Sequence, residues 1–113
     1  MLGYGGEAGY DYNYVCVPND AFYDCSNLHT ITLPRNLSII HNGAFYNCTS
    51  LNNIILPNTV RYISDNAFTN CYALDNLTYE GTMEEWQNGS VKYQAFWCTS
   101  LEVVHCSDGD VRI

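Results

Sequence analysis

The stretch from Ala44 to Asn66, AFYNCTSLNNIILPNTVRYISDN, is one copy of a repeat, and this repeat decides the fold. Another copy begins at Ala21 and a third at Ala67, so the step along the chain is 23 residues. The recurring positions include Ala21/Ala44/Ala67, Phe22/Phe45/Phe68, Cys25/Cys48/Cys71 and Leu28/Leu51/Leu74. A unit this short cannot bury its own apolar side chains, so we expect successive copies to stack on one another.

Partial copies flank the three full ones. One starts at Ala95, displaced by a five-residue insertion and one residue shorter between Phe96 and Cys98. Another is read at the N-terminus, where Val17 lies 23 residues before Ile40. We therefore divide the chain into residues 1–20, a degenerate repeat or cap; residues 21–94, three repeats of which the last carries the insertion; and residues 95–113, a partial repeat and cap.

Each unit is expected to contribute one short strand. In the motif LxxIxL, apolar residues alternate with polar ones, and Pro34 or Pro57 follows directly. Copies one repeat apart would pair as parallel strands at about 4.8 Å spacing. The second half of each unit, with the pattern VxxI, returns the chain to the next level. The product is a right-handed coil of short strands around a stacked apolar core.

The full pattern, C-x-x-L-x-x-I-x-L-P-x-x-V-x-x-I-x-x-x-A-F, resembles the leucine-rich repeats of the BspA-like type. The similarity extends to YEGTMEEW at 79–86 and VHCSDGDV at 104–111, which look like a last-repeat insertion and a terminal segment. The resemblance implies a leucine-rich-repeat solenoid of the β-rich α/β class, a right-handed superhelix of short parallel strands with an irregular or short helical convex side. It also implies a module of bacterial cell-surface or adhesion proteins that binds host or neighbouring-cell components.

The insertion contains a helix signal. Thr82 and Glu85 have the spacing of a capping box, and Glu84 and Glu85 fall in the first turn of the predicted helix, where negative charge is favourable. Trp86 is expected to cover the core at this end of the stack.

Charge and hydropathy exclude several classes of partner. The 113 residues carry a net charge of −8 with only four Lys and Arg residues, so nothing resembles the basic stripe of a nucleic-acid or anionic-lipid binder. No apolar run approaches the roughly twenty residues of a membrane span. The first ten residues, MLGYGGEAGY, lack the features of a secretory signal, so we expect a cytoplasmic chain unless it is part of a longer surface or secreted protein.

The six cysteines are interpreted as structural. A disulfide, a zinc ligand and a nucleophile are the alternatives, but Cys25, Cys48 and Cys71 occupy one position in successive units and are expected to stack as a buried ladder. No paired C-x-x-C ligands are present, so neither a metal nor a cofactor is predicted. Cys98 and Cys106 are also assigned to the core.

Catalysis is not expected. The pairs Cys25/His29 and His105/Cys106 lack a third orienting group at a matching position, and no phosphate loop or paired carboxylates are visible. The SDGD stretch at 107–110 is interpreted as a terminal turn rather than a calcium loop. Asn47, although part of a glycosylation-type sequon, is predicted to be a turn former.

Strand alternation places a candidate ligand-binding face on the outward side of the predicted concave sheet. Its residues are Thr30, Thr32, Asn53, Ile55, Asn76, Thr78, Val103 and His105. Such positions can equally be ordinary solvated strand residues, but Ile55 is an aliphatic where polar residues prevail.

Three functions follow from the sequence. The first is a non-catalytic protein-interaction module that binds a protein partner through the predicted face. The second is a structural cap or spacer of a longer repeat protein, and the third is a cysteine-dependent enzyme. Because a short stack has two ends, end-to-end self-association is a further expectation.

Overall fold

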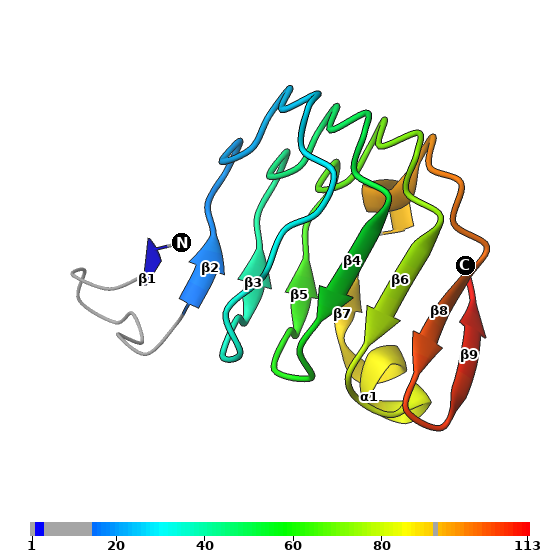
Figure 1. Ribbon diagram of the computed structural model, residues 1–113. Helices are drawn as coiled ribbons and strands as arrows, with labels where there is room; N and C mark the ends of the chain where they lie inside the picture. Colours follow the sequence, from blue (N-terminus) through cyan, green and yellow to red (C-terminus); the bar gives the residue numbers. More distant parts are fainter. Residues whose placement is uncertain (1, 4–14, 92) are drawn as a thin grey trace.

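Two sheets are built from the two halves of the repeats in the computed structural model, which describes residues 2–3, 15–91 and 93–113 (Figure 1). The four-stranded sheet has the order β4 (Asn53–Leu56), β6 (Asn76–Tyr79), β8 (Val103–Cys106) and β9 (Gly109–Arg112). The five-stranded sheet has the order β1 (Leu2–Gly3), β2 (Val15–Val17), β3 (Ile39–Ile40), β5 (Tyr62–Ile63) and β7 (Ser90–Val91). The chain therefore crosses from one sheet to the other within each unit.

The strand register follows the sequence repeat. In the four-stranded sheet Asn53 lies opposite Asn76 and Leu56 opposite Tyr79, in parallel. In the five-stranded sheet Ile40 pairs with Val17 on one side and Ile63 on the other. The predicted parallel strands are confirmed from the second unit onward, and Val17 takes the place that the degenerate copy requires.

The predicted irregular or short helical convex side is corrected in part, because the short strands β2, β3, β5 and β7 pair in parallel there, with irregular segments between them. The repeat brings the same backbone segment alongside itself in every unit, so neighbouring amides and carbonyls pair: Ser38 N–H donates to Val15 O, and Arg61 N–H to Ser38 O. The β-branched and aromatic residues of β3 and β5 favour this extended backbone. Helical turns occur near the insertion, as α1 (Met83–Asn88) and η1 (Tyr93–Phe96).

The strand predicted in the first unit is also absent. Residues 28–34 do not form a strand, and the four-stranded sheet begins with β4. Asn52 N–H donates to His29 O at 3.2 Å, after which the first-unit segment diverges from β4 (Figure 1). Ile31 and Leu33 are only half-buried there, so less apolar contact holds this segment against the sheet than in the later units.

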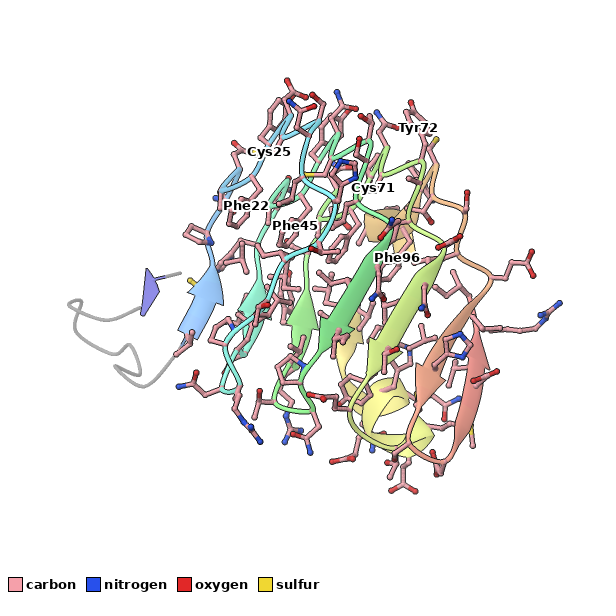
Figure 2. All side chains as sticks on the ribbon, viewed as in Figure 1. Phe22, Cys25, Phe45, Cys71, Tyr72 and Phe96 are labelled. Atoms are coloured by element: carbon pink, nitrogen blue, oxygen red, sulfur yellow. The ribbon has the colours of Figure 1, made fainter. Side chains whose placement is uncertain are left out.

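Four phenylalanines form the centre of the core. Phe22, Phe45, Phe68 and Phe96 stack with nearly parallel rings, at centroid distances of 5.2, 5.1 and 5.6 Å (Figure 2). Phe96 continues the stack, so the displaced fourth copy is in structural register despite the insertion. The inward strand residues Ile54, Leu77 and Val104 are buried beside the stack.

The C-terminal end of the stack is covered. Helix α1 begins with the predicted capping box: Glu85 N–H donates to Thr82 Oγ1, and Thr82 N–H to Glu85 Oε1. Trp86 is buried and meets Tyr79 edge-on at 5.2 Å, as expected of a cap. The SDGD stretch is the predicted turn, joining β8 to the antiparallel β9. Among the residues described, no helix is long and apolar enough to cross a membrane.

Candidate functional site

Six of the eight predicted face residues lie together on the outward side of the four-stranded sheet, which we call the outer face. Alternation along β4 leaves Ile55 exposed between the buried Ile54 and Leu56. In register, Asn53 lies opposite Asn76, and Thr78 lies opposite both Ile55 and His105. The outer face comprises Asn53, Ile55, Asn76, Thr78, Val103 and His105.

Thr30 and Thr32 do not belong to the outer face. They are exposed, as predicted, but lie in the first-unit segment that forms no strand with β4. Thr32 instead lines a hollow beside the face, and Thr30 does not.

The hollow lies where the first-unit segment separates from β4. It has a volume of about 260 Å³, and its lining consists of Ile31, Thr32, Leu33, Arg35, Ile55, Pro57 and Glu80. Ile55, 48% exposed, links the outer face to the hollow. The missing strand pairing thus coincides with a concave site whose lining is part apolar and part polar, with a charge of each sign.

The polar groups differ between the two sides of the outer face. Near β4, Arg35 and Glu80 line the hollow. At the β9 side, His105 Nδ1 lies 2.9 Å from Asp110 Oδ1, and both side chains are about half exposed. An extended ligand crossing the strands would therefore meet the hollow with Arg35 and Glu80 at one side and the histidine–carboxylate pair at the other.

The cysteine ladder is largely as predicted. Cys25, Cys48, Cys71, Cys98 and Cys106 form no disulfide; Cys48 and Cys71 are buried, and Cys25 is half-buried. The Cys48 thiol donates to Phe22 O at 3.1 Å, and the Cys71 thiol to Phe45 O at 3.0 Å. Each buried thiol therefore satisfies a carbonyl of the preceding unit.

Cys98 is exposed, which contradicts its assignment to the core. The one-residue deletion places Cys98 at the left-handed turn position, with φ of 60°, that Asn47 and Asn70 occupy in other units. Thr99 takes the cysteine position instead, and its hydroxyl donates to Phe96 O. Cys106 is half-buried against the core, as expected from the leucines at its position. Asn47 is a turn former with φ of 64°.

The arrangement offers little for chemistry. His105 and Cys106 are adjacent on β8, so their side chains point to opposite faces. Burial, together with Asp108 and Asp110, raises the pKa of Cys106. Within the described part of the chain, no group of three His, Cys, Asp or Glu residues could hold a metal ion. Asp108, a candidate for calcium in the SDGD stretch, accepts from Met83 N–H at 2.9 Å.

Of the residues that line the hollow, the sequence predicted Thr32 and Ile55 as site residues and expected Ile31 and Leu33 to point inward. It gave no role to three others: Arg35, Pro57 and Glu80. All three follow a strand segment, where the repeat pattern assigns no facing direction. Pro34 and Pro57 occupy equivalent repeat positions directly after a predicted strand. They could have indicated that the ends of these segments lie close together.

The family comparison agrees with the repeat. Residues 15–112 match a family model described as BspA type Leucine rich repeat region (6 copies). No curated protein and no solved structure matched the chain.

Proposed function

Since the chain belongs to the BspA-type leucine-rich-repeat family, we propose that it is a non-catalytic protein-interaction module that binds through the outer face and its adjoining hollow. One observation carries the proposal. Ile55 is an exposed aliphatic between two buried residues of its strand, and it lines a hollow together with Ile31 and Leu33. Exposed apolar surface next to a concavity is typical of sites that take a partner's side chain.

The partner that fits best is an extended protein segment. The hollow lies against β4, the first strand of its sheet, on the side where the first-unit segment turns away. A strand laid along such an edge gains main-chain hydrogen bonds, and a pocket accepts one of its side chains. The apolar walls formed by Ile31, Leu33 and Ile55 favour an aliphatic side chain there.

We further propose that the repeats wind as a right-handed superhelix, a leucine-rich-repeat solenoid, within a cell-surface or adhesion protein. Parallel strands joined through crossovers support this hand. The partner would then be a surface component of a host or neighbouring cell. No nucleic acid or membrane insertion is part of the proposal.

We do not propose catalysis. The buried thiols of Cys48 and Cys71 donate to carbonyls, and the hydrogen bond with Cys48, together with burial, raises the pKa of Cys71. His105 contacts Asp110 but has no thiol on its own side of the sheet. These contacts support a structural role for the cysteines.

Selection from a phage library of random peptides tests the binding proposal. Peptides enriched on the wild-type protein should lose binding to Ile55→Asp and keep binding to Tyr62→Asp, a matched change at an exposed residue of the other sheet. Equal loss in both variants, with both still folded by circular dichroism, would show that the selected peptides do not use the outer face.

A structural cap or spacer is the second candidate function. The first unit supports it, because its repeat positions Phe22, Cys25 and Leu28 are half-buried whereas their equivalents in the second unit are buried. Another repeat stacked there would complete their burial. Sequencing the gene around this segment tests the idea: adjoining in-frame repeats of the same pattern support it, and unrelated flanking sequence opposes it.

A further inference from the structure

Exposed aromatic side chains gather along the edge where the repeats turn. We call this the turn edge, and it consists of residues 20–26, 43–49, 66–72 and 94–100. Backbone hydrogen bonds join its successive turns: Phe22 N–H donates to Ala44 O at 2.7 Å, and Phe68 N–H to Ala95 O at 2.8 Å. Tyr23, Tyr72 and Trp97 are 48%, 56% and 59% exposed. Figure 2 places Tyr72 at this edge, away from the outer face.

Tyr23 presents one face of its ring at the first turn. The other face stacks on Tyr46, with centroids 5.1 Å apart and ring planes 10° apart. Stacking fixes the orientation of Tyr23, so a partner would lose little side-chain freedom from this residue on binding. Tyrosine and tryptophan in such rigid positions are typical anchors of protein interfaces.

Two carboxylates flank Tyr23. Asp20 and Asp24 both have left-handed backbone, with φ of 57° and 60°. A Cβ added at Gly43 would collide with the Asp20 carboxylate and lie 3.9 Å from the Tyr23 ring, so these two side chains cover the same spot. Asp24 accepts from Asn47 Nδ2 at 2.8 Å. The charge of Asp24, followed by burial, Tyr46 and Asp20, raises the pKa of Tyr23.

The backbone does not require these charges. At the position of Asp20, the next two units have Gly43 and Asn66, with φ of 69° and 60°. At the position of Asp24 they have Asn47 and Asn70. Neutral residues therefore satisfy the same turn elsewhere, and the first turn alone among the four combines two carboxylates with an exposed tyrosine.

We propose that the turn edge is a second interaction surface, and that it binds an arginine-bearing segment of a partner protein at Tyr23. The guanidinium plane stacks on the face of Tyr23 opposite Tyr46, and the exposed carboxylates of Asp20 and Asp24, which lean toward Gly43 and Asn47 in the free protein, turn to accept from its N–H groups. Arginine fits better than lysine because a planar fork can stack and pair at once. The turn edge contains no Lys, Arg or His residue to repel it, and the chain has a net charge of −8.

The rest of the turn edge defines the kind of partner. Tyr72 and Trp97 extend the exposed aromatic surface over the later turns. A free amino acid or a small cation could not contact Tyr23, Tyr72 and Trp97 at the same time, so the surface fits a protein partner. This inference is independent of the outer face, because the two surfaces share no residue.

Titration with blocked peptides, followed by nuclear magnetic resonance, tests the proposal. The probes are Ac-Gly-Arg-Arg-Gly-NH2 and its lysine analogue. The arginine peptide should shift the Tyr23 and Tyr46 ring signals and bind more tightly than the lysine peptide. Tyr23→Leu, and separately the double change Asp20→Asn with Asp24→Asn, should weaken arginine-peptide binding by about tenfold. Asparagine retains the left-handed turn, so the double variant should fold.

A charge-matched control separates the site from bulk attraction. Glu84→Gln with Glu102→Gln removes two exposed carboxylates away from the turn edge and should change affinity by less than about twofold. An equal loss of arginine-peptide affinity in this control would overturn the proposal. The proposal would also be overturned if the lysine peptide bound as tightly as the arginine peptide and if Tyr23→Leu did not weaken its binding. Ring shifts caused by a neutral oligosaccharide such as maltohexaose, but not by the arginine peptide, would overturn it in favour of a glycan.

Discussion

The first and second repeats have the same residue types at six core positions, but they bury them differently. In the second repeat all six are buried, and in the first none is. The pairs are Ala21 with Ala44, Phe22 with Phe45, Cys25 with Cys48, Leu28 with Leu51, Ile31 with Ile54, and Leu33 with Leu56. Since the side chains are alike, the difference in burial comes from the neighbouring repeats: the second repeat lies between two full repeats.

The same difference creates the hollow. Where a preceding strand would pair, the first-unit segment diverges from β4 and leaves Ile31 and Leu33 facing Ile55 across a space of about 260 Å³. At the other end, β9, α1 and Trp86 cover the stack. Further apolar surface can still be buried at an edge that no strand covers, and for this reason we propose the binding site there.

The largest effect should come from truncating a stacked phenylalanine. Phe45→Ala removes a fully buried ring with a neighbour on each face, and we expect a loss of about 3–5 kcal/mol in the free energy of unfolding. Phe22→Ala should cost roughly half as much, because this ring is half-buried and stacks on one side only. Urea denaturation measures both, and equal losses would contradict the difference between the repeats.

The covered end can be opened by changing Trp86. Trp86→Ala should cost about 3 kcal/mol, since the side chain is 3% exposed and packs on Tyr79. Trp86→Phe should cost much less, because the buried indole Nε1 makes no hydrogen bond that would be lost. Unfolding free energies of the two variants decide this, and similar losses would mean that the indole nitrogen has a partner.

Alkaline pH should weaken the buried part of the cysteine ladder. A hydrogen bond with the Cys48 thiol, together with burial, raises the pKa of Cys71 above its ordinary value of 9.0. The unfolded chain therefore loses this proton first, and the free energy of unfolding should fall above pH 9 by up to about 1.4 kcal/mol per pH unit. Cys71→Ala should reduce the slope in urea titrations at several pH values. A slope unchanged by the substitution would refute the assignment.

The smallest effect tests the helix that covers the C-terminal end. Thr82→Ala removes the acceptor of the Glu85 amide and should cost about 1 kcal/mol. Thr82→Ser keeps the hydroxyl and serves as the control in the same denaturation series. A loss as large in the serine variant would show that the methyl group, not the cap, matters.

The sequence predicted what the repeat period determines. The stacked positions of Phe22, Phe45 and Phe68, the strands β4 and β6, and the capping box at Thr82 follow from residue types at fixed spacing. The period also selected Ile55 as unusual, and the structure places it on the lining of the hollow.

What the sequence did not predict depends on neighbours rather than on spacing. The first unit has the strand pattern, but within the described part of the chain no strand pairs with residues 28–34. Cys98 has the repeat residue type, but a single deletion moves it to a turn position. The second sheet was missed because the two apolar residues of the VxxI pattern, three positions apart, are compatible with a return loop as well as with a two-residue strand.

Amide hydrogen exchange tests the central claim, an open binding edge at the first repeat, most directly. In the free protein, amides of residues 30–33 should exchange orders of magnitude faster than those of their equivalents, 53–56, in β4. Adding a peptide selected on the wild-type protein should then protect 30–33 and β4. Equal protection of the two segments in the free protein, or protection confined to β9 and α1 on binding, would contradict the account.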